Sequence, residues 1–342
     1  MEAPLIEGWL GGAGGGGAIP ILDEASVSAA RQRTREVARE QSLSAVDTER
    51  LATIASELAH NQLAHGRDGQ LAVNAIVRDG HTGVEIVAAD AGAGIADPSR
   101  ALQGMPRGKG SLGIGLAAVR EHAHELDVDV RLGEGTCVRA RVFARLATRR
   151  REVGIFGRPY RDERRSGDHA SFLRDGARLL VTVCDGLGHG REAREAADAA
   201  INVFAQHGTG SPRSVLERAH AALAATRGAV MAVVAVQEGP APSLDLASVG
   251  NITVALVRAR SERRFGATSF VVGAAQPAWR PHVEVVAMDP HDLLVLHTDG
   301  IQSRISVAAD ETLLRQHPVS IAHQLAERFG REDDDVLVLV AI

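Results

Sequence analysis

The chain has 342 residues, of which 45% are hydrophobic and 24% are charged, fractions that are typical of a globular protein with room for two cored domains. The formal net charge is -5, which excludes a strongly basic protein, and we expect no nucleic-acid partner. No apolar run reaches membrane-spanning length, so we expect no membrane partner. Both cysteines, Cys137 and Cys184, lie in apolar runs, which favours reduced thiols and a cytoplasmic location.

Residues 1–18 contain the glycine-rich run 11–17. They lack a charged region before an apolar core, so they do not match a signal peptide. We expect these residues to form a flexible leader.

The first predicted domain covers residues 19–143. A polar, arginine-rich helix is expected over residues 25–41, and Ser44 with Asp47 three residues later is typical of the N-terminal cap of a second helix. Apolar residues then follow at helical spacing and predict one buried face, and Gly66 is a plausible end of this helix. The apolar positions are Leu51, Ile54, Ala55 and Leu58.

Two hairpins complete the first domain. Asp79-Gly80 is a hairpin turn signal between strands at residues 71–77 and 84–89. Residues 116–126 are predicted to be helical, and a second hairpin joins residues 128–132 and 136–142. This order predicts an α/β sandwich with one helical layer.

Several residues of this domain together favour a nucleotide site. Glu57 and Asn61 are four residues apart and share one helix face, where an amide oxygen can hold Mg²⁺. Asp90 ends an apolar strand, where its carboxylate can accept a hydrogen bond from an adenine amino group. Gly92 and Gly94 allow the backbone to turn closely around a base.

A glycine-rich segment over residues 108–115 leads into a helix N-terminus, a favourable place for phosphate. It does not fit a Walker A loop, and no strand precedes it as a dinucleotide-binding fingerprint requires. Thr136, on the last strand, can add a hydroxyl near the base. The candidate nucleotide contacts of the segment are Lys109, Gly110, Gly113 and Gly115.

This order of motifs resembles the ATPase domain shared by gyrase, histidine kinases and MutL, the GHKL family. Glu57-Leu-Ala-His-Asn61 and Gly108-Lys-Gly-Ser-Leu-Gly-Ile-Gly-Leu116 are similar to its serine-kinase branch, the anti-sigma factor and stressosome switch kinases. The resemblance covers about residues 19–143. It implies that ATP binds with Asp90 on adenine and Asn61 on Mg²⁺, and that Glu57 acts as general base on a substrate serine.

A basic stretch without clear periodicity, residues 144–151, is expected to be a linker. The second predicted domain covers residues 152–342 and alternates strands with clustered helices, which suits two sheets covered by helices. Strands are expected at residues 153–158, 178–184, 230–237, 244–249, 253–258, 283–288, 293–297 and 336–342. Helices are expected at residues 192–206, 214–226 and 319–329.

Acidic residues occur at the edges of these strands. Asp168 lies in a polar loop, Asp185-Gly186 and Asp299-Gly300 end two apolar runs, and a run of three aspartates, 333–335, precedes the last strand. Buried carboxylates are costly unless they are paired or coordinate cations. Aspartates with almost no cysteine or histidine favour Mg²⁺ or Mn²⁺, and two such ions can activate a water for attack at phosphorus.

The motifs Asp185-Gly-Leu-Gly-His-Gly190, Val249-Gly-Asn251 and Thr298-Asp-Gly-Ile301 resemble the type 2C metal-dependent protein phosphatases, in their SpoIIE-like branch. The resemblance covers about residues 152–342 and implies an αββα sandwich. It also implies two metal ions held by Asp185, the Gly186 carbonyl and Asp299, with Asp168 beside them. The register of the last strand favours Asp334 as the final ligand, with Asp333 as the alternative. The branch often has glycine where this chain has Ser166.

The sequence therefore predicts a bifunctional regulator, an ATP-dependent serine kinase joined to a metal-dependent phosphoserine phosphatase. By resemblance, the substrate is a STAS-domain partner in bacterial partner-switching signalling, and further partners are a sigma factor or a downstream signalling protein. Oligomers are possible. In a second interpretation the N-terminal domain only binds ATP or sequesters a partner, and in a third ATP tunes the phosphatase.

Overall fold

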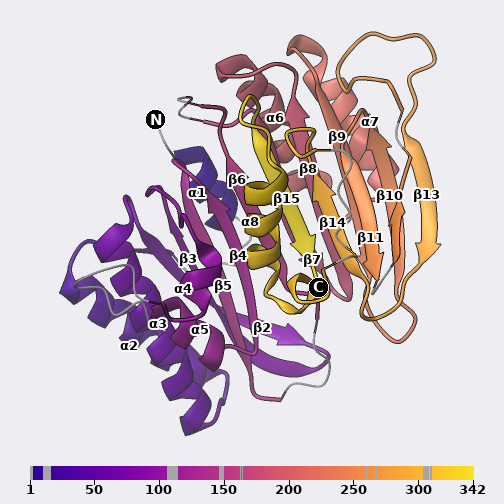
Figure 1. Ribbon diagram of the computed structural model, residues 1–342. Helices are drawn as coiled ribbons and strands as arrows, with labels where there is room; N and C mark the ends of the chain where they lie inside the picture. Colours follow the sequence, from indigo (N-terminus) through magenta and orange to yellow (C-terminus); the bar gives the residue numbers. More distant parts are fainter. Residues whose placement is uncertain are drawn as a thin grey trace. The chain divides into compact units, whose positions relative to one another are not determined.

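The computed structural model describes residues 3–10, 17–105, 115–145, 150–161, 163, 165–258, 261–266, 268–302, 308 and 310–342 (Figure 1). The chain divides into two compact units, Met1–Val153 and Gly154–Ile342. Each unit combines helices with β-sheet, which confirms the predicted α/β class. Among the described residues, no helix is both long and apolar enough to cross a lipid bilayer.

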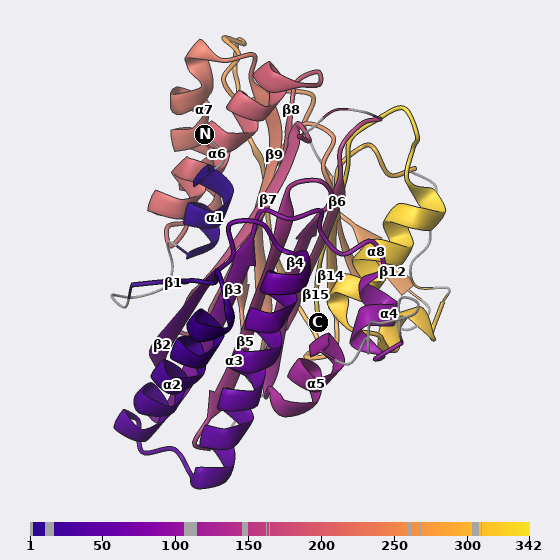
Figure 2. The same cartoon turned by 90° about the vertical axis from the view of Figure 1, so that its left-hand side faces the viewer.

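The first unit contains an antiparallel sheet in the order β1-β2-β3-β5-β4. Two long helices, α2 (Glu24–Glu40) and α3 (Ala45–His65), pack side by side on it (Figure 2). Two short helices, α4 (Pro98–Leu102) and α5 (Gly115–His122), follow β3. The strands are β1 (Ile19–Pro20), β2 (Gln70–Arg78), β3 (His81–Asp90), β4 (Glu125–Arg131) and β5 (Gly135–Phe143).

Local sequence explains where these elements begin and end. The Ser44 hydroxyl accepts a hydrogen bond from the Asp47 amide and caps α3, as the sequence predicts. Asp79 and Gly80 both have positive φ, 51° and 79°, the backbone that a two-residue hairpin turn requires. This turn sets the register between β2 and β3. Strand β3 ends at Asp90, which pairs with Thr136 of β5.

The structure differs from the predicted leader at residues 3–10. They form helix α1 (Ala3–Leu10), which packs against the sheet of the first unit rather than remaining flexible. Ile6 and Trp9 are buried in an apolar cluster with Ala72, Val87, Ala89, Ala91 and Cys137. The Trp9 indole donates to Asp129 of β4 at 2.9 Å. The adjacent glycine run conceals this short apolar anchor in the sequence.

The second unit contains two sheets, β6-β15-β14-β11-β12 and β13-β10-β9-β8-β7. Helices α6 (Arg191–His207) and α7 (Pro212–Ala222) cover the second sheet, and α8 (Pro318–Phe329) packs on β15 of the first. In sheet order, the strands are β6 (Val153–Arg158), β15 (Val336–Ala341), β14 (Leu293–His297), β11 (Thr253–Arg258) and β12 (Ser261–Arg264), then β13 (His282–Ala287), β10 (Ser243–Val249), β9 (Ala229–Gln237), β8 (Arg178–Gly186) and β7 (Asp168–Asp175).

All eight strands predicted for this unit are present, and the sequence missed β7 and β12. Strand β7 matters for the site because it begins at Asp168, which the sequence placed in a loop. Its polar residues hide it, but it pairs along its whole length with β8, so that Asp168 lies opposite Asp185.

Replacing Leu51 by alanine tests the predicted buried face of α3. Leu51 is 0% exposed, whereas Leu22, in the same unit, is 76% exposed and serves as the matched control. We expect Leu51→Ala to lower the free energy of unfolding by about 2–5 kcal/mol because it leaves a cavity, and Leu22→Ala to change it by less than about 0.5 kcal/mol. Denaturant unfolding followed by circular dichroism measures both. Equal effects of the two substitutions would contradict the assigned burial.

Candidate functional site

Helices α3 and α5 bring three predicted nucleotide residues together in the first unit. A Cβ atom added to Gly115, the first residue of α5, would lie 2.9 Å from Asn61 Oδ1 and 3.2 Å from Glu57 Oε2. Glu57 and Asn61 are both partly exposed on the same face of α3. The start of α5 therefore lies against an amide and a carboxylate, and only a glycine fits between them without displacement.

The fourth predicted residue, Asp90, is held by its own turn. Its Oδ1 accepts a hydrogen bond from the Gly92 amide at 2.8 Å, which leaves Oδ2 to accept from another donor. Burial raises the pKa of the Asp90 carboxyl, and the Gly92 amide offsets part of this shift. A single carboxylate aimed by a backbone amide is suited to accept from a base amino group.

Two glycines beside Asp90 have backbone geometry that a side chain would disturb. Gly94 has a φ of +76°, and a Cβ there would lie 2.8 Å from the Arg131 carbonyl oxygen. At Gly135, with a φ of +140°, the added atom would lie only 1.9 Å from the Asp90 carbonyl oxygen. Thr136 follows directly and is buried opposite Asp90. Three further predicted contacts, Lys109, Gly110 and Gly113, lie outside the described residues.

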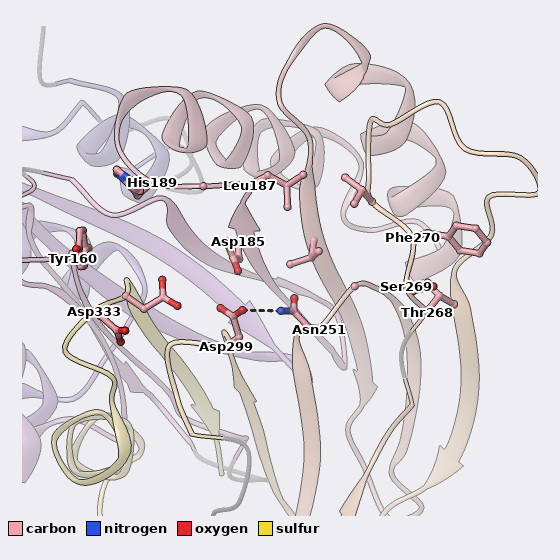
Figure 3. Close-up of a pocket in the computed structure, with 15 residues that line it drawn as sticks. Tyr160, Asp185, Leu187, His189, Asn251, Thr268, Ser269, Phe270, Asp299 and Asp333 are labelled. Carbon is pink, nitrogen blue, oxygen red and sulfur yellow. Dashed lines mark hydrogen bonds between the residues drawn. The ribbon is translucent and has the colours of Figure 1, made fainter.

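Paired strands collect the predicted metal residues in the second unit. Asp168 on β7 and Asp185 on β8 are cross-strand partners. Asp168 is 3% exposed, and its Oδ2 accepts from the Thr298 hydroxyl at 2.6 Å. Next to Thr298, Asp299 accepts from the Asn251 side-chain amide at 2.8 Å (Figure 3). Residues more than a hundred positions apart thus supply one acidic cluster.

Electrostatic repulsion within this cluster is evident in the pKa values of its carboxyls. Burial, and then the charges of Asp299 and Asp334, raise the pKa of Asp185 to about 8. Burial and the charge of Asp185 raise the pKa of Asp168 well above its usual range. Burial and Asp299 also raise the pKa of Asp334. Groups that resist ionisation together in this way are stabilised as anions when a cation lies between them.

A pocket of about 680 Å³ opens onto this cluster. Asp185, Asp299, Asp333 and Asp334 line it, whereas Asp168 is buried beside Asp185 and does not. Gly186 ends β8 next to Asp185, and its amide donates to the Gly167 carbonyl at 3.2 Å. The wall also includes Tyr160, His189 and Asn251 (Figure 3).

The three consecutive aspartates differ in their surroundings. Asp335 is 5% exposed and its two oxygens accept from the amides of Tyr160 and Gly167, at 2.7 and 2.8 Å, so it anchors the loop that precedes β7. Asp333 and Asp334 both line the pocket. Of these two, Asp334 is the one whose charge raises the pKa of Asp185, which favours Asp334 over Asp333 as a metal ligand.

The donor set suits a hard divalent cation. In the described part of the chain, no three carboxylate, histidine or cysteine side chains lie close enough together to hold a metal ion, so these residues form no ready-made cage. Mg²⁺ requires no such cage, because it keeps several waters and binds through one or two carboxylates. The oxygens of Asp185, Asp299 and Asp334 therefore fit hydrated Mg²⁺ or Mn²⁺ better than a dehydrated or soft metal.

Sequence reasoning did not include several supporting residues among its candidates. Asn251 stands in a motif that was noted for its resemblance, but its bond to Asp299 spans 48 positions and has no local signal. Ser166, which stands where the family often has glycine, accepts from the Asp168 amide at 3.0 Å, and Arg194 donates to the Ser166 carbonyl. The serine side chain therefore contributes a hydrogen bond to this turn that a glycine could not.

Fold and motifs together define a chain that joins a GHKL-type ATPase domain to a type 2C-like phosphatase domain. Residues 21–142 match the family model of the histidine kinase-like ATPase domain, and residues 175–341 match that of stage II sporulation protein E (SpoIIE). The chain belongs to the histidine kinase-like ATPase family through its first unit and to the SpoIIE family through its second.

Similar proteins include a curated kinase and a solved stressosome structure. The serine/threonine-protein kinase RsbT of Bacillus subtilis (strain 168) is 34% identical over 122 residues, which are 36% of this chain and 92% of that protein. A solved structure described as "The bacterial stressosome: a modular system that has been adapted to control secondary messenger signaling" is 31% identical and matches with a TM-score of 0.52. The match covers 56% of this chain and 99% of that one.

A structure of RsbX in complex with magnesium is 20% identical and has a TM-score of 0.50. The match covers 57% of this chain and 96% of that chain. At this level of identity the likeness concerns the fold alone.

The acidic cluster predicts that Asp185→Asn stabilises the protein in the absence of divalent cations. The unfolded Asp185 loses its proton near the usual value of 3.8, whereas the folded residue keeps it up to about pH 8. Between these values the folded state binds the extra proton, so stability falls as pH rises through this window. We expect Asp185→Asn to raise the melting temperature at pH 8 by about 2–8 °C and to have little effect near pH 4.

Thermal unfolding in EDTA at both pH values measures this effect. Asp175→Asn, at the exposed end of β7, is the control. A lower melting temperature for Asp185→Asn at pH 8 would contradict the repulsion inferred for the cluster.

Asn251 is predicted to hold the carboxylate of Asp299 in position. Removing the amide with Asn251→Ala is expected to weaken Mn²⁺ binding about tenfold, the usual effect of losing a residue that orients a metal ligand. Isothermal titration calorimetry measures the affinity, with Ser269→Ala on the same pocket wall as the control. Unchanged Mn²⁺ affinity in Asn251→Ala would exclude this role.

Proposed function

We propose that the chain is a bifunctional regulator that phosphorylates a serine with its first unit and hydrolyses phosphoserine with its second. Its substrate is a STAS-domain protein of a bacterial partner-switching system, with a sigma factor or another downstream signalling protein as a further partner. Membership of the two families and the similarity to RsbT support this proposal. The observation that carries it is that each unit has its own acidic site, supported by its own strands and helices.

In the first unit, Glu57 is assigned as general base. ATP supplies the phosphoryl group, and Mg²⁺ neutralises its charge. Asp90 accepts a hydrogen bond from the adenine amino group, Thr136 lies beside it, and Asn61 supplies an amide oxygen for the ion. Glu57, one helical turn from Asn61, would accept the proton of the substrate hydroxyl as its oxygen bonds to the γ-phosphorus of ATP and the bond from that phosphorus to the bridging oxygen breaks, releasing ADP.

In the second unit, the aspartates are assigned as the anionic wall of a hydrolytic site. When bound, two divalent ions would supply Lewis acidity and would lower the pKa of an attacking water. Asp185, Asp299 and Asp334 would hold these ions together with the Gly186 carbonyl, and the buried Asp168 is the cross-strand neighbour of Asp185. Thr298 and Asn251 fix the orientation of Asp168 and Asp299 through the hydrogen bonds given above.

Carboxylate-to-amide substitutions separate the two activities. Glu57→Gln is expected to reduce phosphorylation of a STAS protein at least about a hundredfold, within the range of a lost general base, and to leave dephosphorylation unchanged. Asp185→Asn is expected to have the opposite effects. The assay uses the full chain with ATP and Mg²⁺, then Mn²⁺, with STAS proteins encoded nearby, and maps phosphoserine by mass spectrometry.

Glu49→Gln, an exposed position two turns earlier on α3, is the matched control for Glu57→Gln. Unchanged phosphorylation in Glu57→Gln would refute Glu57 as the general base, whereas absence of phosphorylation by the wild-type chain would refute the kinase assignment and favour a first unit that only binds ATP or a partner. Phosphatase turnover that responds to ATP in that same variant would favour ATP as a regulator of the second unit.

A further inference from the structure

The pocket of the second unit has an apolar part besides its acidic part. We define the apolar wall as Leu187, Val230 and Val271, which line the same pocket as the four aspartates. Leu187 is 36% exposed, unusual for a leucine in this otherwise well-buried unit. A Cβ atom added to Gly228 would lie 2.8 Å from Val271 Cγ1 and 3.8 Å from Leu187 Cδ1. The two side chains therefore stand next to each other over the Gly228 backbone.

Hydrogen bonds hold the apolar wall in place. The Leu187 amide donates to the Gly228 carbonyl at 3.1 Å. On the other side, the Val271 carbonyl accepts from the Trp279 indole at 3.0 Å, and Trp279 stacks on His220 with ring centres 3.9 Å apart. A wall fixed in this way loses little conformational entropy when a ligand binds.

Its position next to the carboxylates limits what can bind there. Figure 3 shows Leu187 on the segment that leads from Asp185 to His189, so the wall adjoins the acidic cluster. Among the lining residues within the described part of the chain there is no lysine or arginine. An acidic residue beside the phosphoserine would find no lysine or arginine among these lining residues to pair with, whereas an apolar residue would bury its surface on Leu187 and Val271.

The size of the pocket also indicates more than a phosphate group. Its volume of about 680 Å³ lies within the usual range for whole-ligand sites. Because the acidic part accounts for the phosphate and its ions, the remaining space belongs to the residues that flank the phosphoserine.

We propose that the apolar wall binds an apolar side chain adjacent to the phosphoserine and so selects the substrate segment. This inference rests on the proposed phosphatase function of the same pocket. The occupant is a stretch of the phosphorylated partner protein, with leucine, isoleucine, valine or methionine next to the modified serine.

Matched phosphopeptides test the selection. Three peptides differ only in the residues that flank the phosphoserine, which are leucine, glycine or aspartate. With the full chain and Mn²⁺, we expect kcat/KM for the leucine peptide to exceed that for the glycine peptide about tenfold, as for a small apolar side chain in a fitted pocket. The aspartate peptide is expected to be the poorest substrate. Equal kcat/KM values for the leucine and glycine peptides would overturn the proposal.

Variants of the apolar wall locate the preference. Leu187→Ser and Val271→Ser are each expected to reduce the leucine-to-glycine ratio of kcat/KM to about threefold or less, because the buried apolar contact is lost. Val285→Ser, on β13 and 70% exposed, is the matched control and should retain the ratio. A ratio that survives both wall substitutions would place the preference elsewhere and overturn the proposal.

Hydrolysis of p-nitrophenyl phosphate by the wild-type chain distinguishes a failure of the phosphatase function from a failure of the proposed role of the apolar wall. If the chain hydrolyses this small substrate but shows equal kcat/KM values for the leucine and glycine phosphopeptides, only the proposed role of the apolar wall is refuted. Absence of turnover of every substrate with Mn²⁺ and with Mg²⁺ refutes the phosphatase function, and the inference that rests on it fails with it.

Discussion

Repulsion among buried carboxylates is the interaction on which the second unit depends. Asp168 and Asp185 face each other across a strand pair, and Asp299 and Asp334 add charge from two other strand ends. Burial favours the neutral form of a side chain, and the raised pKa of Asp185 shows that its ionised form is disfavoured here. The fold keeps the cluster together because each aspartate adjoins a strand of a well-buried sheet. It therefore keeps these mutually repelling carboxylates together at the expense of its own stability.

Asp90 in the first unit uses the same local design for a different purpose. There, too, an aspartate ends a buried strand and a glycine follows within two residues, but a backbone amide binds one oxygen and no second carboxylate is among the causes of its raised pKa. A lone, oriented acceptor can recognise an amino group, whereas a group of mutually repelling acceptors calls for metal ions. The chemistry of each site follows from what surrounds its aspartate, and the surroundings come from distant parts of the chain.

Much of this arrangement could be predicted from the sequence. Strands β6, β11 and β14 have the bounds that apolar runs indicate. Ser44 caps the predicted helix, and Asp79-Gly80 forms the predicted hairpin turn. Local signals of this kind are physical requirements of caps and turns, so they are visible without an alignment. Helix α1 and strand β7 were missed because their stability comes from packing and pairing with distant residues, which polar or glycine-rich sequence conceals.

The candidate site shows the same limit. Asp185 and Asp299 stand at the ends of apolar runs and could be chosen as site residues from the sequence alone. The residues that support the site through hydrogen bonds could not. Asn251 contacts Asp299 across 48 positions, and Asp335 contacts the Gly167 amide across 168. Both contacts depend on how strands pair, and the strand that starts at Asp168 was itself hidden.

The loop that precedes β7 connects the acidic cluster to the rest of its unit. Asp335 accepts from two amides of this segment, Ser166 accepts from the Asp168 amide, and Arg194 on α6 donates to the Ser166 carbonyl. Asp335 thus stabilises the loop, while its neighbour Asp334, the candidate ligand, lines the pocket. Because one aspartate run supplies both, a shift of the last strand by one residue would move Asp335 away from the loop amides and Asp334 away from its place in the pocket, and so disrupt loop and site together. The register of β15 is therefore a constraint on the geometry of the pocket as much as on folding.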